Sequence, residues 1–120
     1  MGVTYANVTI KPLIKTGKDY TAKFLVDTGA IDCLVPASEL EKIGVERRGN
    51  RIYELADGRR VEFDFGFVEI SLMDEVTVGK VVFGPENTEP ILGVVALESA
   101  LLRVNPISNQ LEKLPYGLLK

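Results

Sequence analysis

The chain has 120 residues, of which 46% are hydrophobic and 26% are charged, and its formal net charge is −3. This length suits a single domain over residues 1–120, and apolar residues spread along the whole chain argue against disorder. An acidic balance excludes the electrostatic footprint of a nucleic-acid-binding protein, and no stretch approaches the ~18 apolar residues that span a bilayer, so we expect neither partner.

Strands and one helix are predicted in the first third of the chain. Mixed β-branched, aromatic and polar residues predict a strand over residues 3–10, and a mostly apolar run predicts another over residues 20–26. A short buried strand is expected over residues 33–35. A helix of one or two turns should follow, with Ser38 as its N-cap and Gly44 at its end.

A long hairpin is the clearest prediction in the middle of the chain. Residues 51–56 and 59–72 form its arms, and Asp57-Gly58 predicts a two-residue turn between them. The apolar residues of the second arm move from one face to the other: Val61, Phe63, Phe65 and Phe67, then Val68, Ile70 and Leu72. Such a change of phase predicts a bulge or a bend.

The last third of the chain adds three strands and a second helix. The strands are expected over residues 76–83, 90–93 and 110–114, and the helix over residues 94–102. The apolar face of this helix is expected to consist of Val94, Leu97 and Leu101. The sequence therefore predicts a mostly β domain with one or two short helices.

What the sequence lacks narrows its chemistry and its location. It has no histidine and a single cysteine, Cys33, which excludes Ser-His-Asp and Cys-His catalysis, histidine metal sites and thiolate zinc sites. Cys33 precedes two apolar residues and is expected in the core. Residues 1–7 show neither the basic nor the apolar region of a signal peptide, which predicts a cytoplasmic protein.

Asp27-Thr28-Gly29-Ala30 is the feature that points to chemistry. A predicted buried strand delivers the Asp27 carboxylate into a turn, in which Gly29 permits close backbone approach and Thr28 offers a hydroxyl. These residue types are equally compatible with an ordinary turn. Ordinary residue usage places the bare tripeptide in roughly a few per cent of chains of this size, so it is weak evidence alone.

Two further features follow that loop along the chain, and their order is informative. The predicted hairpin comes next, and Ile91-Leu92-Gly93 then leads directly into the second predicted helix. In this order of features the sequence resembles the small prokaryotic members of the retropepsin-like aspartic proteases, over nearly the whole chain. The resemblance implies a closed β-barrel, the acid protease half, with the hairpin as a flap.

The resemblance also implies roles for individual residues. Asp27 would be the catalytic carboxylate, with Thr28, Gly29 and Ala30 in its loop and with Ile91, Leu92 and Gly93 as the supporting strand. The flap tip would comprise four residues: Ala56, Asp57, Gly58 and Arg59. Neither a metal ion nor an organic cofactor is implied.

A homodimer follows from the same resemblance, because the chain carries a single Asp-Thr-Gly and the chemistry needs two carboxylates. One Asp27 would activate water for hydrolysis of a peptide or protein substrate, and the other would donate a proton. In retroviral relatives the terminal strands interleave in the dimer, and residues 1–7 and 111–119 are the candidates here; a frayed tail is the alternative.

Two departures from the family pattern concern its binding contacts. Ile31 stands where many relatives carry Ser or Asp, and Val94 stands where retroviral enzymes carry Arg. These departures leave Asp27, Thr28 and Gly29 intact, and together these three residues favour catalysis. Two other functions stay open beside proteolysis. The fold can serve as a dimerisation or peptide-binding module with little or no turnover, and a small ligand-binding β-barrel is a third reading.

Overall fold

The computed structural model describes residues 2–119, and most of its regular structure is β, as predicted. The strands and helices follow one another in this order: β1 Tyr5–Pro12, β2 Tyr20–Val26, β3 Cys33–Pro36, α1 Ala37–Ile43, β4 Gly49–Glu54, β5 Arg60–Leu72, β6 Glu75–Gly84, β7 Ile91–Leu92, α2 Val94–Ser99, β8 Leu102–Val104 and β9 Leu111–Lys113. None of the helices among residues 2–119 is both long and apolar enough to cross a membrane.

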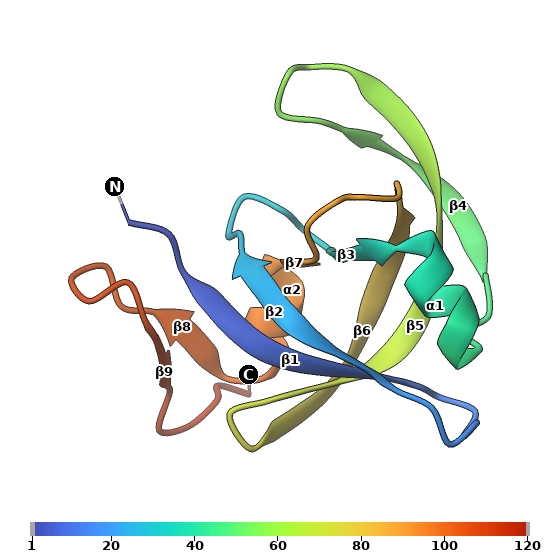
Figure 1. Ribbon diagram of the computed structural model, residues 1–120. Coiled ribbons are helices and arrows are strands. Elements are labelled where there is room, and N and C mark those ends of the chain that lie inside the picture. Colours follow the sequence, from blue (N-terminus) through green and yellow to red (C-terminus); the bar gives the residue numbers. More distant parts are fainter. Residues whose placement is uncertain (1, 120) are drawn as a thin grey trace.

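The first sheet closes on itself as a barrel. Its strands follow the order β1-β2-β7-β3-β6-β5-β4, and an additional antiparallel pairing of β1 with β5 joins the two sides. Strand β4 lies outside this closed ring because it pairs with β5 and extends it as a hairpin. The β4–β5 hairpin arches over the end of the barrel where the loop between β2 and β3 lies (Figure 1).

Apolar side chains from every strand of the ring fill the barrel. Alternate residues point inward on β1, on β2 and on the second half of β5, as the two-residue period of a strand requires. The last four residues of β6 are all buried. Helices α1 and α2 add Leu40, Ile43, Ala96 and Leu97 to the same cluster. Because this core is continuous, the loops at the barrel end rest on a packed base.

Strand β5 changes its buried face without a bulge. Its pairing with β6 runs uninterrupted from Phe65 to Leu72, so the predicted bulge is wrong and the alternative, a bend, remains. Residues 60–65 pair with β4 in the hairpin, whereas Val68 to Ser71 pair with β1 in the barrel. The strand therefore buries one face in the hairpin and the opposite face in the core.

Helix α1 ends as predicted but does not begin as predicted. Gly44 closes the helix in the left-handed conformation, with φ of 85°, as predicted. The helix starts at Ala37, however, and Ser38 is not its N-cap. The Glu86 carboxylate instead accepts hydrogen bonds from the Ser38 amide at 3.1 Å and from its hydroxyl at 2.5 Å.

The turn of the hairpin is longer than predicted. The Gly58 amide donates to the Leu55 carbonyl at 2.9 Å, and the Leu55 amide donates to the Arg59 carbonyl at 2.8 Å. Gly58 has φ of 86°, whereas Asp57 does not have a positive φ, so a two-residue type I′ turn is excluded. The connection is a three-residue loop in which Gly58 takes the left-handed position.

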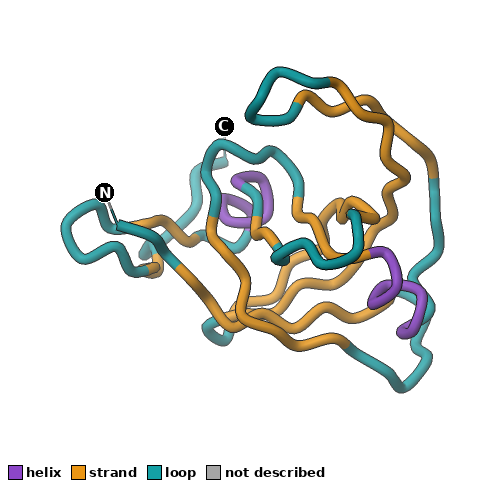
Figure 2. Tube along the Cα trace, turned by 45° about the horizontal axis from the view of Figure 1, so that its top comes forward, coloured by secondary structure: helices purple, strands orange, loops and turns teal. Residues whose placement is uncertain are grey.

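The second helix is shorter than predicted, and a small hairpin follows it. Helix α2 ends at Ser99 because Leu101 is left-handed, with φ of 57°, and Leu102 begins β8. The buried face of α2 includes Ala96 and Leu97, while Leu101 is partly exposed. Strands β8 and β9 pair with each other, as labelled in Figure 1, and the same hairpin is seen from another side in Figure 2. Their loop lies beside the start of β1, because the Thr4 hydroxyl donates to the Asn109 carbonyl at 2.7 Å.

Candidate active site

The loop after β2 presents Asp27 at the mouth of the barrel. The Asp27 amide donates to the Leu92 carbonyl at 3.1 Å, which ties the residue to β7. Its Oδ1 accepts a hydrogen bond from the Gly29 amide at 2.9 Å, so the loop holds the carboxylate by its own backbone. Asp27 and Ala30 are half-buried, and Thr28 and Gly29 are exposed.

Gly93 allows the Asp27 loop to lie directly on the start of α2. A Cβ at Gly93 would lie 2.5 Å from the Asp32 carbonyl oxygen, closer than any side chain tolerates. The Val94 amide donates to the Ala30 carbonyl at 2.8 Å, and the Val95 amide donates to the Ile31 carbonyl at 3.3 Å. The predicted supporting strand and the predicted loop are thus brought into contact through backbone atoms.

A cavity of ≈ 1060 Å³ lies between this loop and the β4–β5 hairpin. Predicted site residues from all three features line it: Asp27, Gly29, Ala30, Ala56 and Ile91. Thr28, Leu92, Gly93, Asp57, Gly58 and Arg59 do not line this cavity, and Leu92 is fully buried beneath the loop. This volume suits a segment of peptide more than a small ion.

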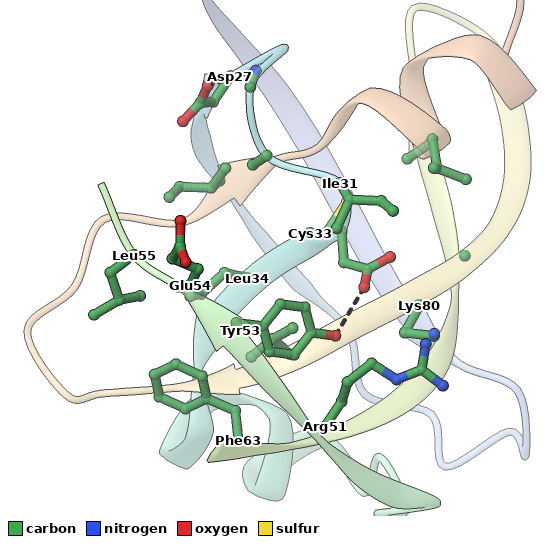
Figure 3. Close-up of a pocket in the computed structure, with 18 of the residues that line it drawn as sticks. Asp27, Ile31, Cys33, Leu34, Arg51, Tyr53, Glu54, Leu55, Phe63 and Lys80 are labelled. Atoms are coloured by element: carbon green, nitrogen blue, oxygen red, sulfur yellow. Dashed lines mark hydrogen bonds between the residues drawn. The ribbon is translucent and has the colours of Figure 1, made fainter. Parts of the chain in front are cut away.

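One side-chain hydrogen bond joins the hairpin to the loop across the cavity. The Tyr53 hydroxyl donates to Asp32 Oδ2 at 2.8 Å, and Figure 3 shows this bond between the two elements. Partial burial raises the pKa of Tyr53 well above its usual range, and the adjacent Asp32 carboxylate raises it further. The phenol is therefore a hydrogen-bond donor at every physiological pH.

Cys33 lies at the base of the site and is fully buried, as predicted. Burial raises the pKa of its thiol to about 11. A thiol of this kind is not a nucleophile near neutral pH, because the thiolate is the reactive form. Within residues 2–119, no three His, Cys, Asp or Glu side chains gather closely enough to hold a metal ion.

Sequence reasoning missed several residues that line the cavity. No role was assigned from the sequence to Asp32, Tyr53, Arg51 or Lys80. Arg51 and Tyr53 are two residues apart in β4, so the two-residue period of a strand places them on the same face. Lys80 belongs to β6, and its approach to the same cavity depends on the pairing of three strands.

Comparison with known proteins agrees with this geometry. A sequence model of the family described as aspartyl protease matches residues 10–96. Among curated proteins, none matches the chain. Among 105 matching chains of solved structures, the solution structure of the simian foamy virus (mac) protease has 18% sequence identity and a TM-score of 0.54, and the match covers 78% of this chain and 91% of that chain. The likeness confirms the predicted retropepsin-like fold.

Proposed function

Since the chain belongs to the aspartyl protease family, we propose that it is an aspartic endopeptidase that hydrolyses peptide bonds as a homodimer. The observation that carries this proposal is the position of the Asp27 carboxylate, fixed by the Gly29 amide at 2.9 Å and facing a cavity large enough for a peptide segment. The carboxylate belongs to the one Asp-Thr-Gly in the sequence, so each chain supplies half of the reacting pair.

The proposed mechanism uses the two Asp27 carboxyl groups of a dimer as one acid and one base. Two carboxyl groups ~3 Å apart cannot both be ionised, because their negative charges repel, so such a pair shares one proton. The ionised member takes a proton from a bound water, which attacks the scissile carbonyl carbon. The protonated member donates to the carbonyl oxygen, and a tetrahedral intermediate forms without a covalent enzyme adduct.

The loop and the hairpin have supporting roles in this proposal. Thr28 is exposed beside Asp27, which leaves its hydroxyl free to brace the matching loop of the second subunit. The hairpin tip, which includes Ala56 and Gly58, would close over the bound peptide and exclude water. Tyr53 supports such a role because it already joins the hairpin to the Asp27 loop through Asp32.

Peptide-library cleavage by the wild type and by Asp27→Asn tests the proposal directly. The substitution preserves the shape of the side chain and removes the base, so we expect cleavage to fall by at least about 10³-fold. Asn109→Asp is the matched control, since it makes the reverse exchange in a turn beyond β8 that does not line the cavity. Cleavage that survives in Asp27→Asn would refute the mechanism.

The same experiment separates catalysis from binding alone. A wild-type protein that binds peptides and cleaves none, at acidic and at neutral pH, is the binding module left open by the sequence. Sedimentation equilibrium then tests the dimer on its own. A chain that stays monomeric at the concentrations where cleavage occurs would contradict the shared pair of carboxyl groups.

A further inference from the structure

Two cationic side chains line the cavity at a distance from the proposed chemistry. Arg51 projects from β4 and Lys80 from β6, and Figure 3 shows both reaching into the space between these strands. Their charged groups lie 5.7 Å and 4.8 Å from the centroid of the same ring, that of Phe65. The two cations are thus placed together over one aromatic side chain, which limits where each can move.

Neither cation is neutralised within residues 2–119. The neighbouring basic residues of the hairpin are paired, Arg59 with Asp57 at 2.7 Å and Arg60 with Glu54 at 3.3 Å. By contrast, no carboxylate of the described residues forms an ion pair with Arg51 or Lys80. Both positive charges can therefore meet a carboxylate that enters the cavity.

The acidic residues of the cavity already have other partners or roles. Glu54 pairs with Arg60, and Asp32 accepts the hydrogen bond from Tyr53 at 2.8 Å. Asp27 lies in the loop held by Gly29. None of these three carboxylates forms an ion pair with Arg51 or Lys80, so both cations stay available on the β4–β6 side, where a peptide side chain would approach.

We infer that this side of the cavity selects peptides with an Asp or Glu side chain at one fixed position, whose carboxylate binds Arg51 and Lys80. The inference rests on the proposed function, because it assigns a substrate class to the same cavity. An extended peptide sends alternate side chains to opposite faces, so one position in the peptide faces this wall. An arginine fork and a lysine ammonium together supply enough donors for both carboxylate oxygens.

A binding selection with Asp27→Asn tests the inference without relying on turnover. Peptides from a random library that the immobilised Asp27→Asn protein retains are sequenced. We expect Asp and Glu at one position to be enriched about twofold to fivefold over Asn and Gln, the size typical of a partly exposed charged contact. Raising the salt concentration should weaken the enrichment.

Substitution of the two cations identifies the wall responsible. Added to Asp27→Asn, the pair Arg51→Gln and Lys80→Gln should abolish the acidic preference, whereas Arg51→Lys should keep most of it. Lys15→Gln with Lys18→Gln makes the same change of charge in an exposed turn outside the cavity and should leave the preference intact. Equal unfolding midpoints of the variants show that each is folded.

The outcomes for this inference and for the proposed function are distinct. No acidic enrichment, an enrichment that persists without both cations, or no retained peptide at all would each overturn the inference. If acidic peptides are selected through Arg51 and Lys80 but the wild type cleaves no peptide, the acidic site is supported and the proposed endopeptidase activity is refuted. Cleavage with no acidic preference would support the proposed endopeptidase and refute the proposed site for an acidic side chain.

Discussion

Gly93→Ala tests whether the start of α2 sets the position of the Asp27 loop. The added Cβ would lie 2.5 Å from the Asp32 carbonyl oxygen and 2.6 Å from its carbonyl carbon, and 2.9 Å from the Ile31 carbonyl oxygen. All three are backbone atoms, so no rotamer change can relieve the contact. The loop or the helix must move.

The size of the movement follows from these distances. An ordinary van der Waals contact begins at 3.4 Å, so the Asp32 carbonyl must retreat by about 0.9 Å. Overpacking of this kind costs about 1–3 kcal/mol of stability. A shift of ~1 Å in a reacting group can cost about 10²-fold in rate, so we expect peptide cleavage to fall by roughly that factor.

Hydrogen exchange gives a readout that does not depend on activity. The Val94 and Val95 amides donate to the Ala30 and Ile31 carbonyls, and both bonds should lengthen in Gly93→Ala. Their exchange should therefore accelerate more than that of the β5–β6 amides. Gly17→Ala is the matched control, because it strains a left-handed turn with no atom within 4 Å of the new Cβ.

Comparison of the two alanine variants isolates the effect on the site. Gly17→Ala should cost about 1 kcal/mol through backbone strain alone and leave cleavage and the exchange of Val94 and Val95 unchanged. If Gly93→Ala keeps the protection of these amides and cleaves within about threefold of the wild type, the loop is not positioned by this contact. The argument from the Gly93 geometry would then be wrong.

Two further changes test the base of the site and its cover. Burial raises the pKa of the Cys33 thiol from 9.0 to about 11, so its contribution to stability is complete below pH 9 and is lost as pH rises through 11. The difference in unfolding free energy between the wild type and Cys33→Ala, measured with urea, should therefore be about 2 kcal/mol smaller at pH 11 than at pH 8. A constant difference would contradict this. Tyr53→Phe removes the donor to Asp32 and should cost about 1 kcal/mol and speed amide exchange in β4. The Tyr20 hydroxyl makes no side-chain hydrogen bond within residues 2–119, so Tyr20→Phe should change neither stability nor exchange in β4. Equal exchange in the two variants would show that the bond from Tyr53 to Asp32 does not hold the hairpin.

Local signals predicted the parts of the fold that depend on neighbours in sequence. Strand β2 has the predicted bounds, since an apolar run next to a turn decides both of its ends. Gly44 ends α1 as predicted because the left-handed position favours glycine in any context. The predicted N-cap of α1 was wrong for the opposite reason. Ser38 binds Glu86, which lies 48 residues further along the chain.

The same division holds for the site. The family resemblance implied that Ile91-Leu92-Gly93 supports the Asp27 loop, and the structure shows how, through the Ala30 and Ile31 carbonyls. Pairing of β4 with β5 and of β5 with β6 decides which side chains share the cavity wall, and no spacing in the sequence shows that register. Arg51 and Lys80 were missed for that reason.

The two walls of the cavity are held with very different strength. The Asp27 loop is fixed by backbone bonds to Leu92, to Val94 and to Val95, and by the close contact at Gly93. The hairpin is joined to that loop, within residues 2–119, by the single side-chain hydrogen bond from Tyr53 to Asp32. Breaking one such bond costs about 0.5–1.5 kcal/mol, which thermal motion supplies readily. This arrangement would keep the carboxylate in place while the hairpin opens, as the proposed endopeptidase requires for entry of a peptide.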